Sequence, residues 1–138
     1  MDRFRYLDHT GDVGIEVYGD TLEALFEHAG DAFTDVVTDP GTVREATETQ
    51  LAVHAPDVEQ LLVEWLTELI YSLDAHEQLF RRYVVRSMDH RQLTATAWGE
   101  PYDPDRHPLR TTVKGATYHQ LEVRRLDGGW TGRVIFDL

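Results

Sequence analysis

The chain of 138 residues contains no cysteine. Disulfide bonds, zinc sites with thiolate ligands and cysteine nucleophiles are therefore excluded. The sequence also lacks an apolar run long enough to cross a membrane, and no basic amino terminus precedes an apolar segment. We therefore expect neither a membrane span nor a conventional secretion signal, and we expect the protein in the cytoplasm.

Basic residues are scarce, and lysine is almost absent. Lys and Arg number 13 against 25 Asp and Glu, the formal net charge is -12, and Lys114 is the only lysine. Because affinity for phosphate groups comes mainly from Lys and Arg, this balance argues against RNA binding by the isolated chain. An acidic, lysine-poor surface suits either a cytoplasm of high salt concentration or a basic partner protein.

The length fits a single domain over residues 1–138, large enough to bury roughly two thirds of its unfolded surface without disulfides. Apolar residues alternate with polar ones in short stretches and follow helical spacing in two longer stretches. The predicted order is β-β-α-β-α-β-β-β-β. This order indicates an α+β domain with two amphipathic helices packed on a mostly antiparallel sheet.

The helical spacing predicts a first helix from about Thr21 to Val37, with Asp20 as its amino-terminal cap. Gly30 in its interior costs about 1 kcal/mol relative to Ala, and we interpret it as a point of close packing on the sheet. A second helix over residues 57–73 is expected to begin at Asp57 as its cap.

Short alternating stretches predict the strands. Those in the second half are expected at residues 79–88, 92–99, 111–125 and 130–136, after earlier strands at 4–7, 13–18 and 45–55. The segment 100–108 contains three prolines and several charged residues, so we expect a loop, with His107 at the surface.

A polar turn at residues 8–12 joins the first two predicted strands. It concentrates an imidazole, a hydroxyl and two carboxylates where a rigid sheet could hold them for binding or catalysis. Asp, Thr and Gly are also ordinary turn formers, whose hydrogen bonds need no function. The residues alone leave both interpretations open.

The segment YLDHTGDVGI at residues 6–15 strongly resembles the opening of the archease family. Further resemblances follow in the family's order: DPDRH at residues 103–107, TVKGATYH at 112–119 and VIFDL at 134–138. Separate motifs spread over a chain of the right length make a specific match. This chain has Gly11 and Gly115 where archeases more often have Ala.

The archease resemblance implies that the first and last strands meet, and that Asp12, Asp137 and the terminal Leu138 bind a divalent metal. Oxygen ligands alone favour a hard cation, so calcium is expected in a structure, with magnesium or manganese as alternatives in function. Two carboxylates about 4 Å apart repel by about 1 kcal/mol in water, which also favours a cation between them. Without the resemblance, the simpler interpretation is that these carboxylates are only solvated.

The resemblance also implies that His9, Lys114, Tyr118 and His119 face a partner protein or its nucleotide. Regular strand pairing would place Lys114 and Tyr118 on one face and His119 on the other. The simpler alternatives are that His9 only stabilises its turn and that Lys114 is a solvated strand residue.

The sequence carries no nucleophile with a neighbouring base and no phosphate-binding glycine loop, so a self-contained enzyme is not supported. The archease resemblance implies instead a protein cofactor of the RtcB-type RNA ligase, which joins RNA ends in tRNA splicing or RNA repair. Such a cofactor promotes guanylylation of the ligase's active-site histidine and multiple turnover, and it meets RNA only through the ligase. A metal-dependent phosphoesterase and a chaperone-like binding protein are the alternatives.

Overall fold

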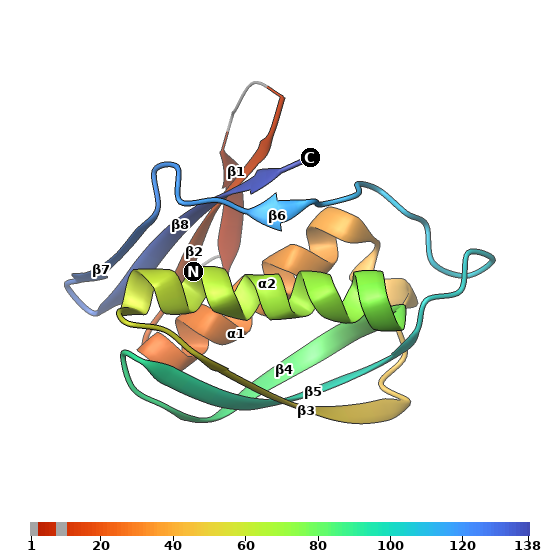
Figure 1. Cartoon of the computed structure of the whole chain (residues 1–138), viewed down its shortest axis with the longest axis horizontal. Helices are drawn as coiled ribbons and strands as arrows, with labels where there is room; N and C mark the ends of the chain where they lie inside the picture. Colours follow the sequence, from red (N-terminus) through yellow and green to blue (C-terminus); the bar gives the residue numbers. More distant parts are fainter. Residues whose placement is uncertain (1–2, 8–10) are drawn as a thin grey trace.

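The computed structural model describes residues 3–7 and 11–138 (Figure 1). The elements in these ranges follow one another as β1 (Phe4–Leu7), β2 (Val13–Gly19), α1 (Leu22–Val37), the short 3-10 helix η1 (Pro40–Thr42), β3 (Thr47–His54), α2 (Val58–His76), β4 (Gln78–Met88), β5 (Gln92–Pro101), β6 (Gly115–Ala116), β7 (Glu122–Leu126) and β8 (Gly129–Asp137).

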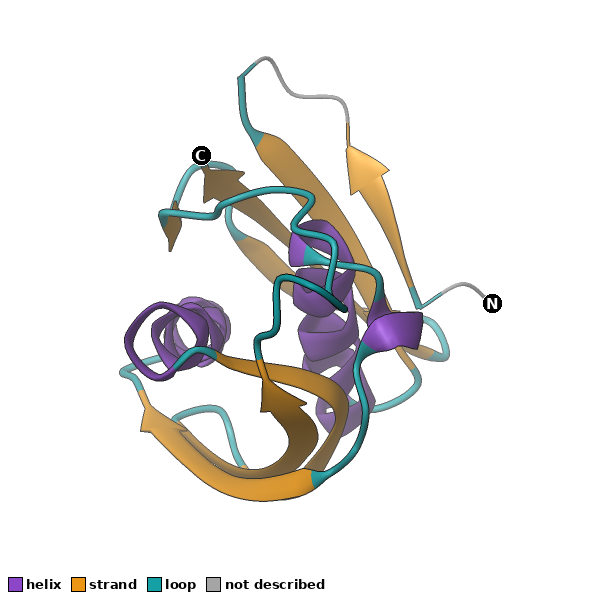
Figure 2. Ribbon diagram, turned by 90° about the vertical axis from the view of Figure 1, so that its right-hand side faces the viewer, coloured by secondary structure: helices purple, strands orange, loops and turns teal. Residues whose placement is uncertain are grey.

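The strands form two antiparallel sheets. One contains β1, β2 and β8 side by side, and both β6 and β7 pair with the other edge of β8. The other sheet is three-stranded, in the order β3-β5-β4. The two helices lie between the sheets (Figure 2): α1 contacts β2 and β8 on one side and β4 on the other. The predicted α+β class with two helices and antiparallel strands is confirmed.

A side-chain cap begins each α-helix. The hydroxyl of Thr21 accepts the backbone N–H of Ala24 at 3.0 Å, so Thr21 caps α1 and the prediction of Asp20 is wrong. The helix begins at Leu22, one residue later than predicted, so the residue directly before it is Thr21 and not Asp20. In α2 the predicted cap is confirmed, since Asp57 accepts the N–H of Gln60 at 2.8 Å.

Both helices contribute to one buried core. A Cβ on Gly30 of α1 would lie 2.7 Å from Cδ2 of Tyr83 in β4, so the predicted close packing is confirmed. Trp65 of α2 is fully buried, and its indole N–H donates to the carbonyl of Phe26 in α1 at 2.9 Å. This hydrogen bond joins the two helices inside the core. Neither helix of the described ranges is both long and apolar enough to span a membrane.

The single strand predicted over residues 111–125 is wrong. Within this range only β6 and β7 pair with β8, and the residues between them form no strand pairs, although the N–H of Thr117 still donates to the carbonyl of Ile135. Gln120 has a left-handed backbone conformation, with φ 54, which a continuous strand does not allow. On β8 only residues 134–135 separate the two paired segments, so the excess residues form a turn. Regular alternation of side chains therefore does not carry from β6 to β7.

Candidate functional site

The start of β2 and the end of β8 lie side by side. Val13 pairs with Phe136, so their neighbours Asp12 and Asp137 lie at the same end of the sheet. Asp12 is half-buried and Asp137 is exposed. The prediction that the first and last strands meet is wrong as stated, because β1 pairs with β2 and it is β2 that pairs with β8. The pairing of β2 with β8 explains how two carboxylates far apart in sequence reach the same sheet end.

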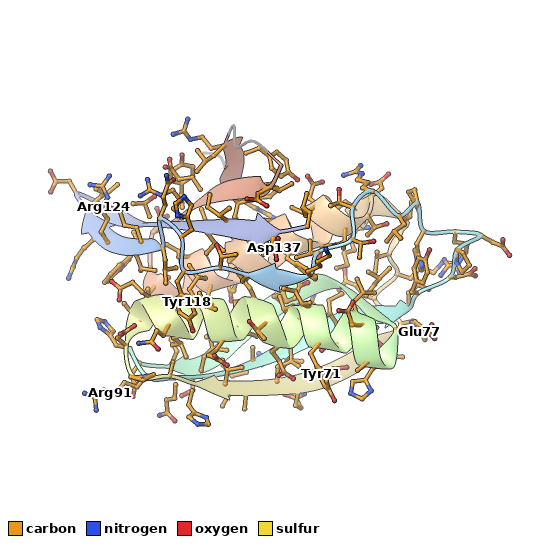
Figure 3. The ribbon with its side chains drawn as sticks, turned by 45° about the horizontal axis from the view of Figure 1, so that its top comes forward. Tyr71, Glu77, Arg91, Tyr118, Arg124 and Asp137 are labelled. Atoms are coloured by element: carbon orange, nitrogen blue, oxygen red, sulfur yellow. The ribbon has the colours of Figure 1, made fainter. Side chains whose placement is uncertain are left out.

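Lys114 belongs to this sheet end as well. Its backbone N–H donates to the carbonyl of Asp137 at 2.8 Å, and the next residue, Gly115, pairs with Asp137 in the sheet. The Lys114 side chain is exposed, while Leu138 packs partly against the core. We call Asp12, Lys114 and Asp137 the strand-end site. Figure 3 shows Asp137 at the end of β8.

A hollow beside the strand-end site contains further polar groups. It has a volume of about 500 Å³, and Asp12, Asp35 and Arg110 line it together with Tyr6. Asp35 lies in the last turn of α1, and Arg110 donates to its carboxylate at 3.1 Å and to its backbone carbonyl at 3.0 Å. The hollow thus places two carboxylates and one guanidinium where a charged ligand could enter.

Tyr6 and Asp35 are joined by a hydrogen bond in which the phenol donates to the carboxylate. Burial raises the pKa of Tyr6 above its usual value, and the hydrogen bond to Asp35 and the negative charge of Asp35 raise this pKa further. The Tyr6 phenol is therefore protonated at neutral pH and serves as a donor, although about half of the residue is exposed. This contact fixes β1 to the end of α1.

Sequence reasoning missed Asp35, Arg110 and Tyr6. One signal was available for Asp35: the partial negative charge at a helix C-terminus disfavours an acidic residue there, and the last turn of α1 contains no basic residue. An acid that opposes the helix dipole needs a partner from elsewhere in the fold, and Arg110 is that partner.

The other predicted partner-facing residues are distributed differently. His9 lies outside the described residues. Tyr118 and His119 are both exposed, and they belong to the turn at residues 117–121 and not to a strand. The regular strand pairing on which the predicted faces of Lys114, Tyr118 and His119 depended is therefore absent. Their predicted roles stay predictions.

The proline-rich segment forms a loop from residue 102 onward, but His107 is buried and not at the surface as predicted. The N–H of Asp103 donates to Nδ1 of His107 at 2.9 Å, so the proton of the neutral ring resides on Nε2. The Nε2–H of His107 donates to the carboxylate of Glu100, which also accepts the backbone N–H of Arg44. Local polarity suggested a surface histidine, whereas these hydrogen bonds satisfy the ring in the interior.

A metal at the strand-end site would find two side-chain carboxylates, from Asp12 and Asp137. Among the described residues, no group of three or more His, Asp or Glu side chains is arranged to hold a metal ion. Magnesium commonly uses only one or two protein carboxylates and keeps water or phosphate oxygens as its other ligands, whereas calcium takes six to eight oxygens. Two side-chain carboxylates, together with the terminal Leu138 of the predicted set, leave room for water or phosphate oxygens on a hard cation, and the predicted metal site of Asp12, Asp137 and Leu138 stays a prediction.

The geometry defines an α+β protein in which Asp12, just before β2, and Asp137, the last residue of β8, lie at one sheet end together with Lys114. The Archease protein family model matches residues 4–138. Protein archease of Methanosarcina mazei is 37% identical over 140 residues, which cover 99% of this chain and 96% of that protein. Protein archease of Sulfolobus acidocaldarius is 34% identical over the full length of both chains.

Solved structures agree with these similarities. The solution structure of protein 1598 from Methanobacterium thermoautotrophicum matches with a TM-score of 0.83 and 34% identity over all of both chains. The crystal structure of an archease, described as a possible chaperone, from Thermotoga maritima matches with a TM-score of 0.66 at 20% identity and supports the fold alone. The chain belongs to the archease family.

Proposed function

We propose that this protein activates an RtcB-type RNA ligase in the cytoplasm, in tRNA splicing or RNA repair. It promotes guanylylation of the ligase's active-site histidine and so allows multiple turnover, while the ligase itself carries out the covalent chemistry. Membership of the archease family supports the partner. The observation that carries the proposal is the pairing of β2 with β8, which brings Asp12, the residue before β2, to the same sheet end as Asp137, where the backbone N–H of Lys114 bonds Asp137.

The strand-end site supplies the groups that positioning of a triphosphate requires. Asp12 and Asp137 would hold a divalent metal, which when bound neutralises phosphate charge. Lys114 is exposed next to them and offers a mobile ammonium group to a phosphate oxygen. Because phosphoryl and nucleotidyl transfer gain rate mainly from orientation and charge neutralisation, a preformed set of such groups can accelerate the ligase without reacting itself.

The experiment is multiple-turnover guanylylation of the cognate ligase at matched manganese and GTP. The native chain is expected to stimulate it, and Asp137→Ala is expected to lose the stimulation. Asp127→Ala serves as the matched control, because Asp127 lies in the exposed turn at the opposite end of β8. Equal stimulation by Asp137→Ala and the native chain would remove the strand-end site from the mechanism, and absence of stimulation by the native chain would overturn the proposed function.

A chaperone-like role is the second candidate, because the related protein from Thermotoga maritima is described as a possible chaperone. It predicts that the chain suppresses aggregation of several unrelated proteins and that Asp137→Ala does so equally well. Aggregation assays with two unrelated client proteins therefore separate it from ligase activation.

A further inference from the structure

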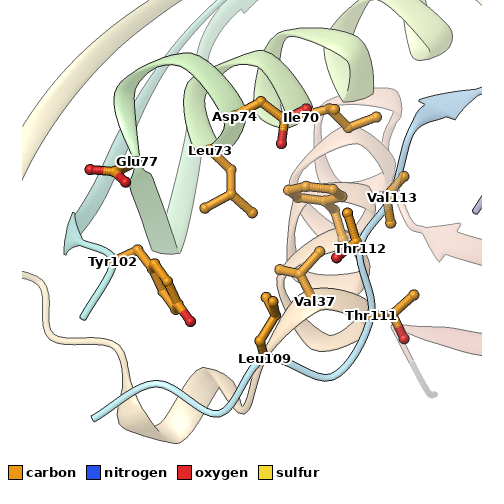
Figure 4. Close-up of a pocket in the computed structure, with 11 residues that line it drawn as sticks. Val37, Ile70, Leu73, Asp74, Glu77, Tyr102, Leu109, Thr111, Thr112 and Val113 are labelled. Atoms are coloured by element: carbon orange, nitrogen blue, oxygen red, sulfur yellow. The ribbon is translucent and has the colours of Figure 1, made fainter. Parts of the chain in front are cut away.

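A second, apolar pocket lies between the C-terminal ends of the two helices (Figure 4). Its floor consists of buried or half-buried apolar side chains from both helices and the segment before β6: Phe33, Val37, Ile70, Leu73 and Val113. Tyr102 and Leu109 border it, and Leu109 is 53% exposed. We call this the helix-end pocket. An apolar cavity that reaches the surface beside an exposed leucine is a favourable place for an apolar group from another molecule.

The size of the pocket restricts its occupant. Its volume is about 230 Å³, which is below the range of roughly 300 to 1,000 Å³ typical of sites for small-molecule ligands. One aliphatic or aromatic side chain is a better match for this volume than a nucleotide. The helix-end pocket therefore suits a side-chain anchor of a protein partner, of the kind that dominates binding energy at interfaces.

The rim of the pocket is acidic. Asp74 and Glu77 line it, both exposed at the C-terminal end of α2 (Figure 4), and the helix dipole adds partial negative charge at that end. The pocket lining contains no Lys or Arg. An apolar side chain entering this pocket is therefore best flanked by Lys or Arg, whose charges complement the two carboxylates.

The pocket adjoins the strand-end site directly. Thr111, Thr112 and Val113 line it, and the following residue is Lys114, whose N–H bonds Asp137. Consecutive Cα atoms are about 3.8 Å apart, so the pocket wall and Lys114 fall within one footprint of a protein partner, which typically covers about 800 Å². One ligase surface of ordinary size can therefore reach the strand-end site and the helix-end pocket together.

We infer that the helix-end pocket is the anchor point of the ligase, filled by an apolar ligase side chain flanked by Lys or Arg. This inference rests on the proposed function and assigns binding and activation to two different sites. The helix-end pocket supplies affinity, and the strand-end site supplies the rate enhancement once the complex has formed.

The test measures affinity and rate separately, with two pocket variants in the full chain. Asp74→Arg reverses one rim charge, and Leu109→Ala shortens an exposed side chain whose truncation leaves the core intact. Glu64→Arg is the matched control, because it makes the same charge change at an exposed position of the same helix away from the pocket. Binding to the ligase is measured by fluorescence anisotropy, and guanylylation is measured at saturating concentrations of each variant.

Both pocket variants are expected to raise the Kd on the order of tenfold, as truncated anchors at interfaces do, and to stimulate fully at saturation. Glu64→Arg is expected to bind like the native chain, and Asp137→Ala is expected to bind but not to stimulate. An unchanged Kd for both pocket variants, while the native chain binds, overturns the pocket inference alone. Binding without stimulation by the native chain overturns the proposed function alone, and absence of binding by the native chain overturns both.

Discussion

Nε2 of His107 lies 2.9 Å from Oε2 of Glu100, and both side chains are buried. The same carboxylate accepts the backbone N–H of Arg44 at 2.7 Å and forms an ion pair with Arg106. This cluster attaches the loop after β5 to the segment before β3. It therefore holds in place the chain that continues to the helix-end pocket and the strand-end site.

The Glu100 cluster predicts a stability that depends on pH. Burial by itself would raise the pKa of Glu100, but the N–H of Arg44, His107 and Arg106 outweigh it and hold the pKa down at about 2. Because the folded pKa is lower than the ordinary value of 4.5, the carboxylate contributes its full stability above about pH 4.5. That contribution is lost as the pH falls toward 2.

We therefore expect Glu100→Gln to lower the unfolding free energy at pH 7 by about 2 to 3 kcal/mol, the scale of lost hydrogen bonds to a charged group. The difference from the native chain should shrink between pH 4.5 and 2, as measured by urea unfolding across this range. Asp105→Asn, in an exposed position of the same loop, is the control and should follow the native curve. A difference that stays constant with pH would contradict the role of the charge.

Replacing Gly30 by Ala should change stability in the direction opposite to the one that helix propensity predicts. Ala in place of Gly in a helix interior normally gains about 1 kcal/mol, but here the new Cβ would lie 2.7 Å from the Tyr83 ring. Overpacking of a core costs about 1 to 3 kcal/mol, so Gly30→Ala should be net destabilising in thermal or urea unfolding. Gly115→Ala is the contrast: a Cβ there meets nothing within 4 Å and φ is not positive, so it should stabilise by about 0.4 to 1 kcal/mol.

The contact between Tyr6 and Asp35 predicts a titration effect. Asp35→Asn removes the charge and weakens the hydrogen-bond acceptor, so the pKa of Tyr6 should fall toward its ordinary value of 10. It should not reach that value, because burial is the largest cause of the raised pKa and persists in the variant. NMR titration of ring-labelled tyrosine would follow the change, with Asp39→Asn as a charge-matched control near the same helix end. A Tyr6 titration identical in the native chain and Asp35→Asn would refute the contact.

If the proposed ligase presents a basic surface, the net charge of -12 predicts salt-sensitive association. Electrostatic steering acts mainly on encounter, so raising the salt from low to physiological concentration should reduce the association rate constant on the order of tenfold. The dissociation rate constant should change much less. Stopped-flow mixing of labelled protein with ligase measures both, and an association rate that is independent of salt would show that the acidic surface does not steer the partner.

Most secondary structure could be predicted because its causes are local. Helical spacing of apolar residues located α1 and α2, and the side chain of Asp57 bonds an amide only three positions away. The strand predicted over residues 111–125 failed for a local reason of a different kind. Its residues have acceptable strand propensity, but Gln120 adopts a left-handed backbone conformation. Glycine is the usual residue in that conformation, and position 120 is not a glycine, so the residue type gave no warning of the turn.

The candidate site could be predicted only in part, since Asp12, Lys114 and Asp137 were named through family resemblance. Asp35 and Arg110 were missed because their contact joins residues 75 positions apart. His107 was misplaced because a polar ring can be buried only where it finds hydrogen-bond partners, here Asp103 and Glu100. The spacing of apolar and polar residues does not show where such partners will lie.

Alternation of apolar and polar residues, helical spacing and net charge were enough to define an acidic α+β domain with two amphipathic helices, because each of these properties depends on neighbours within a few positions. The division of the strands into two sheets, the register that sets Val13 against Phe136, and the pocket between the helix ends were decided by the tertiary structure. Strand register is chosen by which faces become buried when distant segments meet. The groups proposed to act on the ligase therefore come together only in the folded chain.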